Sequence, residues 1–161
     1  MAITRRVHQA GFQPPSPSDQ VGYKGEPQKI PELEEHGYLR PGVHAADLQE
    51  IATKFGQQSE LRRVQMESVR WLVDLAKRAG SARMVLNGSF VTDALEPNDV
   101  DCVLLIGPGF PRDASAEAEL LAGLPFLEIA LVEHGDFDLL VHAVFATDRH
   151  ATPKGMVEVN L

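Results

Sequence analysis

Two stretches in the first half of the chain have apolar residues at the spacing of an amphipathic helix. In residues 45–55 the apolar positions lie three or four apart, and Asp47 falls in the first turn, where an anion is favoured. A longer run in residues 59–79 starts at Ser59, a residue type that caps helices, and is followed by Gly80, a common stop. The pattern predicts two helices in this half.

The second half contains shorter apolar runs. Residues 83–86, 101–106 and 126–131 are predicted strands, residues 107–111 form a loop rich in glycine and proline, and residues 115–121 are a predicted helix capped by its first serine. These elements together predict an α/β (α+β) fold, with a mixed sheet and flanking helices preceded by the two N-terminal helices.

The C-terminal part of the chain, from residue 136, and the N-terminal 40 residues have less regular patterns. Residues 136–144 alternate between apolar and polar positions, which predicts a strand with Asp138 and His142 on one face. Residues 156–161 are either a last strand or a frayed terminus. Residues 1–40 begin with a stretch rich in proline, so we expect an extended or disordered arm there and a single domain in residues 41–161.

Composition and charge narrow the class of protein. The chain has 161 residues and 43% hydrophobic residues, as expected for one globular domain, and no apolar run approaches the roughly 20 residues of a membrane helix. No apolar segment follows residues 1–6, so we expect no secretory signal, no membrane association and a cytoplasmic location. Cys102 lies in an apolar run and is predicted to be a buried small hydrophobic residue.

The net charge of −8 is unevenly distributed. Residues 1–80 contain eleven Lys and Arg against ten Asp and Glu, whereas residues 81–161 contain four against thirteen. The acidic half favours divalent cations and argues against a broad surface for nucleic acid. If nucleic acid binds, we expect it to use the basic positions of the first half, which are Arg62, Arg63, Arg70, Lys77 and Arg78.

Residues suited to metal and phosphate chemistry lie between the first two predicted strands. A turn signal, Gly88-Ser89, is followed nine residues later by Asp99-Val100-Asp101. Residues two apart in a strand face the same side, so the two carboxylates lie close together. That is unfavourable unless a cation or proton sits between them, and Mg²⁺ takes one or two carboxylates with phosphate oxygens. Gly88 permits a tight turn or a close phosphate, and Ser89 can cap a short helix.

This arrangement resembles the signature of the DNA polymerase β-like nucleotidyltransferase superfamily, a Gly-Ser or Gly-Gly turn followed by Asp-x-Asp or Asp-x-Glu. The sequence surrounding these motifs resembles a small bacterial family of unknown function within that superfamily. The resemblance covers roughly residues 40–161 and rests on residues 41–44, 88–92, 97–101, 145–149 and 154–157.

The resemblance implies a third carboxylate on a later strand, facing Asp99 and Asp101. The matching residue is Asp138, and Asp136, on the same face of the predicted strand, is the substitute. Together the three carboxylates would hold two Mg²⁺ ions, while Gly88 and Ser89 would hold the triphosphate.

Two cations near the C-terminus are further candidates. Arg149 and Lys154 could reach phosphate, and a structural turn held by Arg149 and Asp148 is an equal alternative.

The expected function is Mg²⁺-dependent transfer of a nucleoside monophosphate from a nucleoside triphosphate to an RNA or protein hydroxyl. A cognate partner protein, as in a toxin–antitoxin pair, is expected from superfamily analogy alone. The alternative is a non-catalytic relative that binds a nucleotide or a protein partner. The intact Gly88-Ser89 turn and the Asp99 and Asp101 pair favour the enzyme. The absence of a cation in residues 93–95 favours the alternative, because the family often has a basic residue shortly after the Gly-Ser turn. A third alternative is a structural domain in which the aspartates form only a charge cluster.

Overall fold

A five-stranded mixed sheet organises residues 30–161, the part of the chain that the computed structural model describes. Of the arm predicted for residues 1–40, residues 1–29 lie outside the described residues. Within residues 30–40, Ile30 and Leu39 are buried in the core, and Leu33 forms a β-bridge with Leu39. The strand order is β1-β5-β2-β3-β4, and the strands are β1 (Gly42–Ala46), β2 (Arg83–Asn87), β3 (Val100–Leu105), β4 (Leu127–Val132) and β5 (Gly155–Val159). β2 is antiparallel to both of its neighbours, while β3 pairs with β4, and β1 with β5, in parallel.

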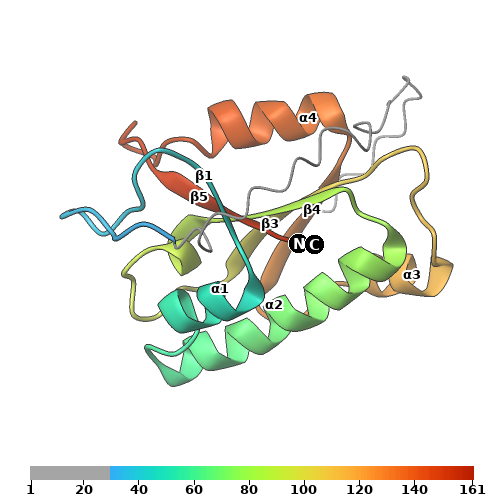
Figure 1. The fold of residues 1–161 in the computed structure, drawn as a ribbon, viewed down its shortest axis with the longest axis horizontal. Coiled ribbons are helices and arrows are strands. Elements are labelled where there is room, and N and C mark those ends of the chain that lie inside the picture. The colour runs from blue at the N-terminus through green and yellow to red at the C-terminus, as the bar shows by residue number, and fades with distance from the viewer. Residues whose placement is uncertain (1–29) are drawn as a thin grey trace, which may run out of the picture.

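Helices α1 (Leu48–Phe55), α2 (Glu60–Ala79) and α3 (Ala114–Ala122) pack on one face of the sheet, and α4 (His134–Leu139) lies on the other (Figure 1). The described residues thus form a mixed α/β fold with four α-helices. None of the helices within residues 30–161 has the length and apolar character needed to cross a lipid bilayer.

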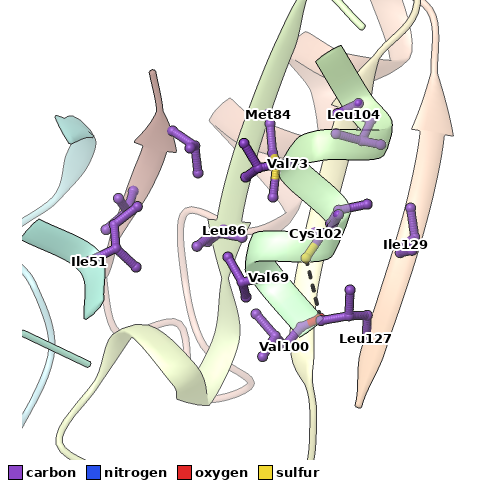
Figure 2. Close-up of a cluster of buried hydrophobic side chains, with 14 of the residues drawn as sticks. Ile51, Val69, Val73, Met84, Leu86, Val100, Cys102, Leu104, Leu127 and Ile129 are labelled. Atoms are coloured by element: carbon purple, nitrogen blue, oxygen red, sulfur yellow. Dashed lines mark hydrogen bonds between the residues drawn. The ribbon is translucent and has the colours of Figure 1, made fainter. Parts of the chain in front are cut away.

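The main core lies between α2 and the sheet. Val69 and Val73 of α2 pack over Leu86 and Cys102 of the central strands (Figure 2). Cys102 is buried and unpaired as a disulfide, as predicted, and its Sγ lies 3.5 Å from the carbonyl oxygen of Val100. Because alternate strand residues face opposite sides, their neighbours Val85 and Val103 belong to a second apolar cluster under α4.

The helix ends follow local chemistry. Asp47 caps α1 and forms a capping box with Glu50, and Ser59 caps α2 by accepting a hydrogen bond from the amide of Arg62. The cap of α3 is Asp113, which accepts from two backbone amides, so the prediction of a serine cap at position 115 was wrong.

Two segments differ from the sequence-based expectation. The predicted helix over residues 45–55 begins only at Leu48, because Gly42–Ala46 form strand β1 and pair with β5. The alternative of a last strand is confirmed by β5, although the strand spans Gly155–Val159.

The strand predicted for residues 136–144 was wrong. This segment is α4 followed by a π-helical turn, Leu140–Val144. Its apolar residues fit a helical spacing as well as alternation, and Phe137 and Val141, four apart, are both buried. The helix covers the second apolar cluster, a face that an additional strand at the sheet edge would have left open.

Candidate functional site

The two aspartates of the predicted pair lie where the loop from β2 enters β3. Asp101 is the second residue of β3, and Asp99 immediately precedes that strand. The apolar residues Val100 and Cys102 both belong to the core under α2, so alternation places Asp99 and Asp101 on the opposite face. The structure therefore supports the prediction that the pair shares one face of the sheet.

A third carboxylate joins them from the neighbouring strand. Glu128 of β4 is paired in parallel register with Asp101 of β3. One carboxylate oxygen from each of Asp99, Asp101 and Glu128 can be chosen so that all three lie within 4.8 Å of one another. We call these three residues the acidic cluster. Carboxylate oxygens at this spacing suit Mg²⁺, Mn²⁺ or Ca²⁺.

The electrostatics of the acidic cluster are strained. Burial, followed by the charges of Asp99 and Glu128, raises the pKa of Asp101 from 3.8 to about 6, while the charge of Lys154 lowers it. Like charges held this close repel each other, and partial burial removes the water that would screen them. A divalent cation would relieve both effects.

Lys154 lies near the acidic cluster, as its effect on Asp101 shows, and it directly precedes β5. The sequence-based prediction that Lys154 reaches phosphate is compatible with this position. Arg149 is exposed in the preceding loop, where its Nε–H points at Nε2 of His150 at 3.2 Å.

The turn around Arg149 is organised by Asp148. The Asp148 carboxylate accepts hydrogen bonds from the backbone N–H groups of His150 and Thr152 and from the Tyr38 hydroxyl. These hydrogen bonds, led by that of Thr152, lower the pKa of Asp148 to about 2.

The Gly88-Ser89 turn lies directly against the acidic cluster. Gly88 has a φ of +75°, and a Cβ at this position would overlap Oδ2 of Asp101. Only glycine can adopt this positive φ without strain and also leave room for the Asp101 carboxylate. The turn itself is a short 3-10 helix, Gly88–Val91, in which the Thr92 hydroxyl donates a hydrogen bond to the Ser89 carbonyl at 2.7 Å.

The loop between Ser89 and Asp99 is tied to helix α2. Arg62 is 1% exposed, and its guanidinium donates to several carbonyls of the loop, including Phe90 at 2.7 Å and Thr92 at 2.9 Å. One turn further along, the Gln65 amide donates to the Pro97 carbonyl at 2.6 Å. Arg62 therefore positions the turn relative to the acidic cluster, and the expectation that it could contact nucleic acid was wrong because it is buried.

Asp138, predicted to be the third carboxylate, lies elsewhere. It is on α4, where its Oδ2 is 3.1 Å from Nδ1 of His134 one turn earlier, and its charge acts on Arg83. The structure does not bring Asp138 into the acidic cluster, because the prediction assumed a strand and the segment is a helix. The substitute, Asp136, is exposed on the same helix.

The sequence did contain a signal for Glu128. An acid in the apolar run of residues 127–132 is unusual for a buried strand, and alternation places it opposite Leu127 and Ile129. What sequence reasoning could not supply was the pairing of β4 with β3, which sets Glu128 beside Asp101.

Residues 31–160 match the family described as "Family of unknown function (DUF6932)". The chain belongs to this family. No curated protein and no solved structure matches it. The family description names no superfamily and no activity, so the acidic cluster and its surroundings are the basis for the function proposed next.

Proposed function

We propose that this protein is a Mg²⁺-dependent nucleotidyltransferase that transfers a nucleoside monophosphate from a nucleoside triphosphate to a hydroxyl group of an RNA or a protein. The observation that carries the proposal is the acidic cluster beside the Gly88-Ser89 turn, with oxygens of Asp99, Asp101 and Glu128 within 4.8 Å. The spacing of that turn and the aspartate pair resembles the polymerase β-like signature, and the strand order supplies a third carboxylate beside it.

Each residue then has a definite role. Asp99, Asp101 and Glu128 would hold the metal ions, and two bound Mg²⁺ ions would supply charge neutralisation for the phosphates and acidify the attacking hydroxyl. Gly88 leaves room for the Asp101 carboxylate against the turn. The Ser89 hydroxyl and the Lys154 ammonium donate to phosphate oxygens, and exposed Arg149 is a second candidate cation.

In the reaction, the acceptor hydroxyl oxygen bonds to the α-phosphorus and the bond to the β-phosphate oxygen breaks. Pyrophosphate leaves, and the hydroxyl proton passes to solvent. The acidic cluster is compatible with this chemistry because its carboxylates lie directly beside Gly88, in the turn that would hold the phosphates.

The test is calorimetric titration of the four nucleoside triphosphates with and without Mg²⁺, using Glu128→Gln and Asp138→Asn as a matched pair. We expect Mg²⁺-dependent binding that weakens at least tenfold in Glu128→Gln and changes less than about twofold in Asp138→Asn, which removes a carboxylate outside the acidic cluster. Release of pyrophosphate from the bound triphosphate would then be assayed with RNA and protein acceptors. Equal binding by the wild type and Glu128→Gln would contradict the proposal.

A second candidate function is binding without catalysis. It is favoured by a cavity of about 640 Å³ beside α1, lined in part by Leu33, Thr53 and Thr92 and by none of the acidic cluster. Its volume is that of a small-molecule site. Triphosphate binding that does not depend on Mg²⁺, or binding that survives Glu128→Gln and is lost in a cavity variant such as Thr53→Trp, would favour this function.

A further inference from the structure

Asn87 ends strand β2, directly across from the acidic cluster. In the antiparallel pairing of β2 with β3, Asn87 is opposite Asp101, which is itself paired with Glu128. Val85 belongs to the apolar cluster under α4 and Leu86 to the core under α2, so alternation turns the Asn87 side chain to the face of the acidic cluster. Opposed residues in antiparallel strands have Cβ atoms about 5 Å apart, so the Asn87 amide lies alongside the Asp101 carboxylate.

The Asn87 side chain is buried without a partner for its oxygen. It is 2% exposed, and Oδ1 accepts no hydrogen bond from any of the described residues. Leaving such an acceptor unsatisfied costs roughly 1–3 kcal/mol, and a native protein seldom does so without a bound ion or water. A leucine of similar volume would avoid this cost, so the amide at this position requires a reason.

The neighbours of Asn87 limit what could satisfy Oδ1. When they are ionised, Asp101 and Glu128 accept hydrogen bonds and cannot donate one to Oδ1. A hard divalent cation can satisfy Oδ1 by coordination instead, because amide oxygens are ordinary ligands of Mg²⁺ and Ca²⁺ sites alongside carboxylates. A cation shared with the acidic cluster would therefore satisfy Oδ1 and relieve the repulsion among the carboxylates at once.

The neutrality of Asn87 has a consequence for substrate binding. Three carboxylates with two divalent cations leave a net charge of +1, which attracts a triphosphate. A fourth carboxylate would reduce that charge to zero while still supplying an oxygen ligand. An amide adds a ligand without adding negative charge.

We propose that the Asn87 Oδ1 is a fourth oxygen ligand of the divalent cation held by Asp99, Asp101 and Glu128. This inference rests on the proposed function, because it assumes that the acidic cluster binds a cation. It extends that function by assigning a ligand outside the aspartate and glutamate set.

The experiment measures Mn²⁺ binding by electron paramagnetic resonance, with thermal unfolding of the cation-free protein as a second readout. The variants are Asn87→Leu, Asn87→Asp and the control Asn98→Leu, which changes an exposed asparagine next to Asp99. We expect Asn87→Leu to weaken Mn²⁺ binding at least tenfold while the melting temperature of the cation-free protein stays the same or rises. A residue with a purely structural role would instead lower the melting temperature. Asn98→Leu should stay within about twofold of the wild type.

Asn87→Asp separates the ligand role from the charge. This variant should bind Mn²⁺ at least as tightly as the wild type and bind Mg²⁺-triphosphate several-fold more weakly. If Asn87→Leu fails to fold, Mn²⁺ binding by Asn87→Asp decides, and binding weaker than that of the wild type overturns the inference.

The remaining outcomes separate the two proposals. If Asn87→Leu binds Mn²⁺ like the wild type while Glu128→Gln does not, the cation site stands and the role of Asn87 is overturned. If the wild type binds no Mn²⁺, both the inference and the proposed function fail.

Discussion

Arg62 and Asp101 are both charged side chains withdrawn from water, but their surroundings are opposite. Arg62 is enclosed by carbonyl oxygens, with its guanidinium donating to Phe55 at 2.9 Å and to Phe90 at 2.7 Å among others. Asp101 lies beside two like charges: burial, and then the charges of Asp99 and Glu128, raise its pKa, while the charge of Lys154 lowers it. Burial lowers the pKa of Arg62 and the charge of Asp93 raises it, and the acceptors of its hydrogen bonds are neutral backbone carbonyls.

The difference separates structure from function. A buried charge with a full set of hydrogen-bond partners holds the fold together, as Arg62 holds the loop to α2. A partly buried carboxylate beside two others is unfavourable unless a bound group offsets the repulsion, and a cation is the simplest such group. The two regions are joined by the loop that runs from Ser89 to Asp99. By holding this loop, Arg62 positions the carboxylates of the acidic cluster.

The largest expected effect is the loss of stability on replacing Arg62, the charge whose hydrogen bonds are all made. Replacing Arg62 with methionine would leave several buried carbonyls unpaired, and we expect the free energy of unfolding to fall by at least about 3 kcal/mol. Urea unfolding measures this. The matched control is Arg63→Met, an exposed neighbour whose ion pair with Glu60 spans 3.6 Å, and it should change stability by less than about 0.5 kcal/mol. Similar losses in the two variants would show that Arg62 is not the structural anchor.

An intermediate effect is expected where the two regions meet. Gly88→Ala places a side chain at a φ of +75° and against Oδ2 of Asp101, so the free energy of unfolding should fall by about 2 kcal/mol and Mn²⁺ binding should be lost. Gly109→Ala, where a Cβ would meet nothing within 4 Å, is the control. Both properties would be followed by thermal unfolding and paramagnetic resonance. Unchanged Mn²⁺ binding in Gly88→Ala would mean that the turn does not shape the acidic cluster.

The smallest effect, and one of opposite sign, is expected at the unsatisfied charge. Because the pKa of Asp101 is about 6 in the folded protein against 3.8 ordinarily, the fold favours the protonated form. The stability that protonated Asp101 contributes is fully present below about pH 4 and is lost as the pH rises through about 6. Asp101→Asn should therefore stabilise the cation-free protein at pH 7.5 by about 1 kcal/mol, after allowance for partial solvent exposure.

The measurement for Asp101→Asn is the difference in unfolding free energy from the wild type at pH 4.5 and pH 7.5, without divalent cations. Exposed Asp136→Asn is the control. A difference that does not grow with pH would argue against repulsion within the acidic cluster.

Local patterns determined much of this protein. Helical spacing and the cap at Ser59 predicted a helix over residues 59–79, and α2 spans Glu60–Ala79. Strands β2, β3 and β4 each lie within one or two residues of their predicted ranges. The shared face of Asp99 and Asp101 also followed from sequence, because alternation along a strand is a local property.

Only the tertiary structure decided which distant residues join that face. Glu128 and Asn87 flank Asp101 because β4 and β2 pair with β3 in a particular register, and no local pattern specifies the pairing of residues that far apart in sequence. The segment around Asp138 satisfied both a strand and a helix pattern, and the helix formed because the second face of the sheet needed an apolar cover. Spacing within a strand is encoded locally, whereas the neighbours of a strand depend on how the whole core is buried.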